Sequence, residues 1–115
     1  LLLTIAAIQS GQFMWGEQIH FVGPIDTAKI QISNFMDALA LFRKKLGRYP
    51  STEEGLKILV DMPERRKPLM RSISLDPWGN EYVYIHPGDH NPGSFDISSK
   101  GADGVLGTED DINNW

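Results

Sequence analysis

Apolar residues recur at alternating intervals of three and four between Ile25 and Leu46, and this spacing constrains the fold more than any other feature of the sequence. Residues with this spacing share one face of an α-helix. The stripe consists of Ile25, Ala28, Ile32, Phe35, Leu39, Phe42 and Leu46, with Met36 widening it. We therefore predict an amphipathic helix over residues 25–46 whose apolar face covers a sheet.

The residues at both ends of this segment suit a helix of that length. Pro24 and Asp26 fit the first turn, and the basic run 43–45 fits the negative end of the helix dipole. Gly47 fits the position just after the helix. A coiled-coil dimer would use the same stripe, but three heptads with two aromatic seam residues support it only weakly.

The rest of the chain reads as short elements joined by turns. In chain order we expect a short helix at 56–60, a polar connection at 61–71, a turn at 76–80, a strand at 81–86, a loop at 87–93 and a second strand at 95–99. Ile112 and Trp115 are expected to bring the end of the chain back to the sheet. This order predicts an α+β fold with one long N-terminal helix on a small antiparallel sheet.

A single domain is the natural count for 115 residues of which 41% are apolar. We assign residues 25–115 to it and leave 1–24 as an uncertain N-terminal segment, either a truncated or divergent helix or a remnant of another sequence. Residues 1–8 are strongly apolar. They are far fewer than the roughly 20 residues that a membrane-spanning helix needs.

Residues 101–111, here called the acidic loop, carry four carboxylates and three glycines but no Lys or Arg. The carboxylates are Asp103, Glu109, Asp110 and Asp111, and their charge of −4 equals the formal net charge of the chain. Clustered oxygen ligands suit Ca²⁺ better than Mg²⁺, which prefers a strict octahedron and keeps its waters. The spacing is not that of an EF-hand. Composition alone leaves a solvated acidic loop as an equal alternative.

Several function classes find little support in the sequence. A pI near 5.2 without a dense basic stripe argues against nucleic-acid binding. The absence of cysteine excludes disulfides and thiolate chemistry. His86 and His90 are separated by Pro87-Gly88, which prevents the helical spacing of a zinc pair. We predict that the protein is not an enzyme, and keep a metal-dependent hydrolase built on the acidic loop as a competing hypothesis.

Four motifs together resemble one family, the G-type major pseudopilin of type II secretion systems. They are G-R-Y-P-S-T-E-E-G-L at 47–56, D-P-W-G-N-E-Y at 76–82, F-D-I-S-S-K-G-A-D-G at 95–104 and D-I-N-N-W at 111–115. They occur in the family's order within residues 25–115. The resemblance implies a pilin-like fold with a calcium site in the loop that follows the sheet.

The resemblance also implies which residues hold the metal. Asp103 and Asp111 match the liganding aspartates of the family, and Asp110 is the next candidate. The backbone carbonyl oxygens of Lys100 and Val105 match its main-chain ligands. The loop is short after Gly107, so the sequence leaves open whether Glu109 or Asp110 completes the shell.

Members of this family form a filament with themselves and work with minor pseudopilins and an inner-membrane assembly platform. A prepilin peptidase cuts the full-length precursor, the N-terminal helix lies in the bacterial inner membrane, and the globular domain lies in the periplasm. The G-F-T-L-x-E processing motif is absent from these residues. A type IV pilus or a specialised secretion filament is the alternative role, and no nucleic-acid partner is expected.

Overall fold

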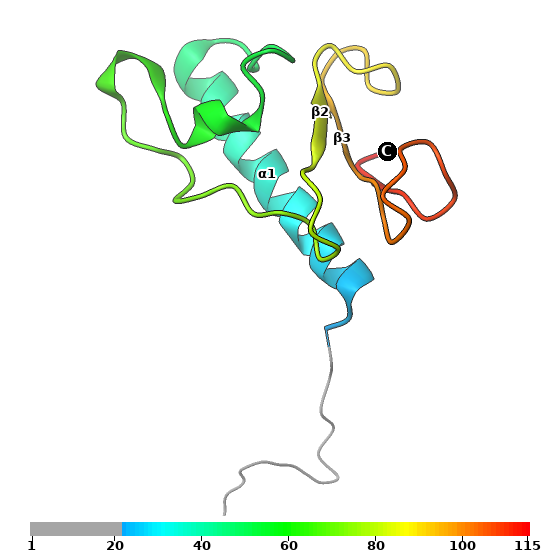
Figure 1. Cartoon of the computed structure of the whole chain (residues 1–115). Coiled ribbons are helices and arrows are strands. Elements are labelled where there is room, and N and C mark those ends of the chain that lie inside the picture. Colours follow the sequence, from blue (N-terminus) through cyan, green and yellow to red (C-terminus); the bar gives the residue numbers. More distant parts are fainter. Residues whose placement is uncertain (1–21) are drawn as a thin grey trace, which may run out of the picture.

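The computed structural model describes residues 22–115 and has the predicted α+β architecture, with one long helix packed on a small antiparallel sheet (Figure 1). Its elements are helix α1 (Pro24–Leu46), 3₁₀-helices η1 (Leu56–Leu59) and η2 (Pro63–Arg65), and strands β2 (Val83–Ile85), β3 (Asp96–Ser99) and β4 (Ile112–Asn113). The predicted segment 1–24 lies mostly outside the described residues, so its boundary stays a prediction.

Helix α1 begins and ends where the sequence indicates. Pro24 occupies the first turn, where its missing N–H costs nothing because the first N–H groups of a helix have no intrahelical partner. At the other end, Gly47 takes a left-handed conformation with φ 76°, and its N–H donates to the Arg43 carbonyl. In the described part of the chain, no helix has both the length and the apolar character needed to cross a membrane.

One face of α1 forms half of the hydrophobic core. Its buried residues are Ala28, Ile32, Phe35, Ala38, Leu39 and Phe42. Two members of the predicted stripe are exposed instead, Ile25 at 52% and Met36 at 38%. Ile25 lies a turn before the first buried residue, and Met36 is rotated by about 100° from its neighbour Phe35. Including these two residues in the core face was therefore wrong.

The sheet has the order β2-β3-β4, and both pairs are antiparallel. Val83 pairs with Ser98, and Ser99 pairs with Ile112, so the predicted return of Ile112 to the sheet is confirmed. Strand β2 is shorter than the predicted 81–86. One reason is that the N–H of His86 donates to the Thr52 hydroxyl at 2.8 Å and not to a neighbouring strand.

Aromatic side chains join the helix to the sheet. Tyr82 packs edge-on against Phe35 with ring centroids 5.2 Å apart, and its hydroxyl donates to the Gln31 side chain. Tyr84 donates to the Pro50 carbonyl at 2.7 Å, which ties the segment after α1 to strand β2. Burial raises the pKa of Tyr82 to about 12, so this hydroxyl remains a proton donor at physiological pH.

Candidate metal centre in the acidic loop

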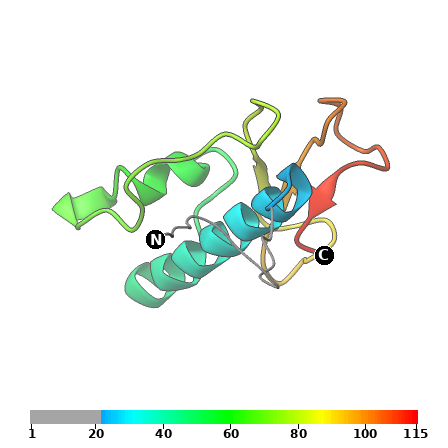
Figure 2. The same cartoon turned by 90° about the horizontal axis from the view of Figure 1, so that it is seen from below.

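The acidic loop connects β3 to β4 and projects from the sheet on the side opposite to segment 47–75 (Figures 1 and 2). Its first residue, Gly101, is buried and has φ 71°. A Cβ at this position would lie 2.3 Å from the Asp110 carbonyl oxygen. Only glycine therefore allows the start of the loop to lie against its end.

Three predicted ligands come together in this loop. One carboxylate oxygen from each of Asp103, Asp110 and Asp111 lies within 4.8 Å of the others. Among the described residues, these three form the one group of acidic, cysteine or histidine side chains whose ligand atoms are close enough to share a metal ion. Glu109 is exposed and does not belong to it, so the geometry favours Asp110 over Glu109 as the third carboxylate.

Each of these carboxylates uses one oxygen to accept a backbone N–H. Asp103 Oδ1 accepts from Val105 at 2.9 Å, Asp110 Oδ2 accepts from Asp103 at 2.9 Å, and Asp111 Oδ2 accepts from Gly107 at 2.6 Å. The second oxygen of each group is directed to a common centre. The loop backbone thus orients the carboxylates, whose free oxygens face one another despite their like charge.

The hydroxyl of Thr108 lies at this centre. Its Oγ1 is 2.7 Å from Asp103 Oδ2, 2.7 Å from Asp110 Oδ1 and 3.4 Å from Asp111 Oδ1. The Val105 carbonyl oxygen is 3.2 Å away, which places this predicted main-chain ligand at the cluster. A hydroxyl has one proton and can satisfy only one of these acceptors. The carboxylate oxygens that it leaves without a proton have a spacing that could hold a metal ion.

The donor set suits a hard divalent cation. It consists of carboxylate, carbonyl and hydroxyl oxygens, which is the chemistry that Ca²⁺ selects. Hydrogen bonds from the Thr108 hydroxyl and the Asp103 N–H hold the pKa of Asp110 below its ordinary value. This side chain is therefore ionised at neutral pH, as a metal ligand must be. The contribution of the Lys100 carbonyl stays a prediction.

A family model described as "Type II secretion system (T2SS), protein G" matches residues 22–115. The chain belongs to this family. The resemblance inferred from four sequence motifs is therefore confirmed.

Relatives within the protein G family are named "Type II secretion system core protein G". That of Escherichia coli (strain K12) is 39% identical over 87 residues, which cover 69% of this chain and 59% of the relative. That of Pectobacterium carotovorum subsp. carotovorum is 45% identical over 92 residues, covering 73% and 58%. The chain thus spans about three fifths of the length of these relatives.

A solved structure shares the fold of this protein G family member. The major pseudopilin from the type 2 secretion system of enterohaemorrhagic Escherichia coli is 36% identical and superposes with a TM-score of 0.69. The match covers 80% of this chain and 86% of that chain. The predicted pilin-like fold class is therefore confirmed.

Neither His86 nor His90 joins the carboxylate cluster of this protein G domain. His86 packs edge-on against Tyr49, and His90 stacks on Trp115 with ring centroids 3.8 Å apart. Trp115 is 49% exposed and, besides stacking on His90, lines a hollow with Val83 and Ile85 of β2. Its predicted role in bringing the chain end back to the sheet stays a prediction. The side chain that the sequence analysis missed is Thr108, because a neutral hydroxyl adds nothing to a pattern of charges.

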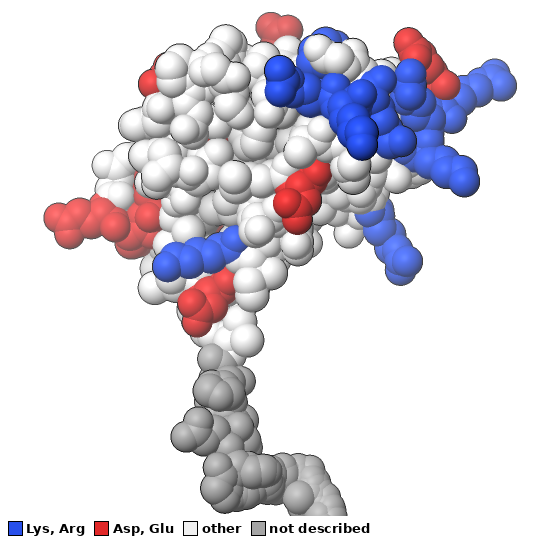
Figure 3. All heavy atoms as spheres, turned by 180° about the vertical axis from the view of Figure 1, so that it is seen from behind, with Lys and Arg blue, Asp and Glu red and all other residues white. Residues whose placement is uncertain are grey.

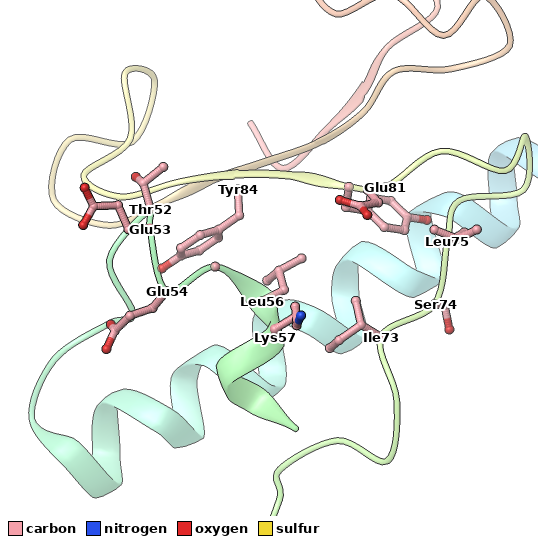
Figure 4. Close-up of a pocket in the computed structure, with 12 residues that line it drawn as sticks. Thr52, Glu53, Glu54, Leu56, Lys57, Ile73, Ser74, Leu75, Glu81 and Tyr84 are labelled. Carbon is pink, nitrogen blue, oxygen red and sulfur yellow. The ribbon is translucent and has the colours of Figure 1, made fainter. Parts of the chain in front are cut away.

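A groove of about 450 Å³ lies between the segment after α1 and strand β2 (Figure 4). Its acidic residues include Glu54, whose side chain accepts from Arg48 at 2.7 and 3.1 Å. Glu54 and Ser51 also close the turn before η1 with reciprocal hydrogen bonds, because each side chain accepts the other's N–H. The Arg48 hydrogen bonds lower the pKa of Glu54 to about 2. Such a weak base is poorly suited to proton transfer at neutral pH.

Glu54→Gln should destabilise the domain by about 0.5–1 kcal/mol at pH 7, a value reduced for the partial exposure of this ion pair. The folded pKa of about 2 lies below the ordinary value of 4.5. The stabilisation is therefore complete above pH 4.5 and is lost as the pH falls toward 2. Urea unfolding of both proteins between pH 7 and pH 2 measures it. Glu53→Gln is the matched control, and a Glu54→Gln deficit that does not shrink in acid would contradict the assignment.

Proposed function

We propose that this chain is the globular part of a major pseudopilin, the structural subunit of a periplasmic filament that drives protein export by type II secretion. The observation that carries this proposal is the protein G family match, which extends from before α1 through the acidic loop to Trp115. In the proposed filament the subunit associates with copies of itself. Minor pseudopilins and an inner-membrane assembly platform are its further partners, and a prepilin peptidase processes the precursor.

Calcium is the proposed cofactor, with a structural role. Asp103, Asp110 and Asp111 would bind it through the oxygens that face Thr108, with the Val105 and Lys100 carbonyls as main-chain ligands. Calcium supplies positive charge that compensates the mutual repulsion of these carboxylates. Its binding would hold the end of the chain in the one conformation that presents the loop to neighbouring subunits.

The surface of the domain is compatible with association between copies. Helix α1 exposes Ile30 at 52% and Leu41 at 45%, on the side away from the core. Its last turn carries the basic run 43–45, and Lys and Arg side chains gather on one side of the face seen from behind (Figure 3). The acidic loop lies on the side of the sheet opposite to segment 47–75, which follows this basic run. Opposite charges on separate surfaces favour contacts between successive subunits.

The alternatives receive less support. The family and the relatives carry the name of type II secretion, which favours this role over a type IV pilus. A hydrolase would need a water held by a metal and activated by a base. In the acidic loop, each of the three converging carboxylates has one oxygen that accepts a backbone N–H. In the groove, the side chain of Glu54 accepts a hydrogen bond from Arg48 and is a poor base. These contacts suit a structural centre.

Deletion of the gene in its native host tests the proposed role. We expect the deletion to cause exported proteins to accumulate in the periplasm and disappear from the culture medium, because the filament lacks its main subunit. Expression of the full-length gene in trans should restore them. Mass spectrometry of both fractions measures this, with surface pili counted in the same strains. Normal secretion, or loss of pili alone, would contradict the type II assignment.

A further inference from the structure

A buried carboxylate outside the acidic loop is linked to it by hydrogen bonds. Asp76 is only 4% exposed. Its Oδ1 accepts the N–H groups of Trp78 at 3.0 Å and Asn80 at 2.8 Å, and its Oδ2 accepts the hydroxyl of Ser99 at 2.7 Å. Within residues 22–115 no Lys, Arg or His forms an ion pair with it. Three hydrogen bonds therefore compensate the burial of this carboxyl group.

Ser99 links Asp76 to the acidic loop by hydrogen bonds. It is fully buried at the end of β3, and because it gives its one proton to Asp76, its oxygen lone pairs are free to accept. The N–H of Gly101 donates to them at 3.1 Å. A Cβ on Gly101 would lie 2.7 Å from the carboxyl carbon of Asp110, so the backbone at 101 lies directly against this ligand candidate. The connection thus runs from Asp76 through Ser99 and Gly101 to Asp110.

We propose that Asp76 and Ser99 are positioning residues for the acidic loop. Their hydrogen bonds hold Gly101 against Asp110, and Asp110 in turn accepts the N–H of Asp103, so the carboxylates converge before any cation arrives. Preorganised ligands bind a metal more tightly, because less ordering remains to be done on binding. The effect on affinity rests on the calcium role proposed above. The effect on loop geometry does not.

The chain offers a matched control in Ser98. It is the same residue type in the same strand and is 3% exposed, but successive side chains of a strand point to opposite faces. Ser98 lines a hollow with Val83 and Ile85 on the other side of the sheet from Asp76. Gly107 and Asp111 of the acidic loop also line this hollow, but among the described residues the Ser98 hydroxyl forms no hydrogen bond to the loop. Ser98→Ala and Ser99→Ala therefore remove the same atom from the two faces of β3.

Amide hydrogen exchange of the isotope-labelled chain in the presence of a chelator tests the geometric part. We expect Ser99→Ala to speed exchange at 101, 103, 105 and 107 by about tenfold, because the loop is released from the sheet. The β2–β3 amides and Ser98→Ala should behave as wild type. Asp76→Asn is the second variant, since its amide would offer Ser99 a donor where an acceptor is needed. Unchanged loop exchange in both variants, or equal acceleration throughout the domain, would overturn the proposal.

Calorimetric titration with CaCl₂ tests the effect on affinity. We expect Kd to rise about tenfold in Ser99→Ala and Asp76→Asn and to stay unchanged in Ser98→Ala. If the wild-type chain binds no calcium, the cofactor proposal fails, the affinity effect falls with it, and hydrogen exchange still decides the loop geometry. If the wild type binds and the Ser99→Ala and Asp76→Asn variants bind equally well, the affinity effect is overturned while the cofactor proposal stands.

Discussion

Calcium should raise the melting temperature of this domain by about 10 °C or more, and a chelator should abolish the increase. A ligand at a hundred times its Kd stabilises the folded state by about 2.7 kcal/mol, and each kcal/mol shifts the melting temperature of a domain of this size by about 4–8 °C. The physical cause is the convergence of Asp103, Asp110 and Asp111, whose oxygens lie within 4.8 Å of one another. Circular dichroism melts with CaCl₂ and with EGTA measure the shift.

Asp103→Asn and Glu109→Gln separate metal binding from general charge repulsion. Each removes one negative charge from the acidic loop, but only Asp103 belongs to the converging group. We expect Asp103→Asn to abolish most of the calcium-dependent shift and Glu109→Gln to retain it. Wild-type melting curves that coincide with and without calcium would exclude the cofactor proposal. An equal loss in both variants would place Glu109 in the metal shell.

Leu39→Ala should destabilise the domain by about 2–5 kcal/mol, which lowers the melting temperature by at least about 8 °C. Leu39 is fully buried in the core, together with Phe35 and Phe42 of α1 and Ile97 of β3. Its truncation removes apolar contacts and leaves a cavity that the surrounding side chains fill only in part. Urea unfolding at constant calcium concentration measures the loss.

The matched control for this substitution is Leu41→Ala. Leu41 lies in the same helix and is 45% exposed, so both variants change helix propensity by the same amount. We expect Leu41→Ala to change the unfolding free energy by no more than about 0.5 kcal/mol. A comparable loss in the two variants would mean that the outward side of α1 is covered in solution.

The predicted helix agrees with the structure because its pattern is local. The spacing of Ile32, Phe35, Leu39 and Phe42 defines an apolar direction on a helix, and Gly47 ends that helix by its own conformational preference. The burial of Ile25 and Met36 was predicted wrongly from the same pattern. Periodicity gives the direction of the buried helix face. How many residues of that face become buried depends on the size of the sheet packed against it.

The candidate site also has a part that the sequence predicts and a part that only the folded loop shows. Clustered charge identified the four carboxylates of the acidic loop, and the family resemblance named Asp103 and Asp111 among them as ligands, with Asp110 as the next candidate. Thr108 was missed because a hydroxyl carries no such signal, and only the folded loop brings it within 2.7 Å of two carboxylates. The choice of Asp110 over Glu109 likewise depends on the backbone conformation, which turns one side chain inward and leaves the other exposed.

The sequence by itself determined the long helix, the α+β class, the location of the acidic loop and, through four motifs, the family. These features follow from residues close in the chain, where spacing, turn chemistry and charge act directly. Only the tertiary structure decided that Asp76, 23 residues before Ser99, shares a hydrogen bond with it and reaches the acidic loop through Gly101. A contact between distant segments depends on strand register and burial, which emerge only when the whole chain packs into one core.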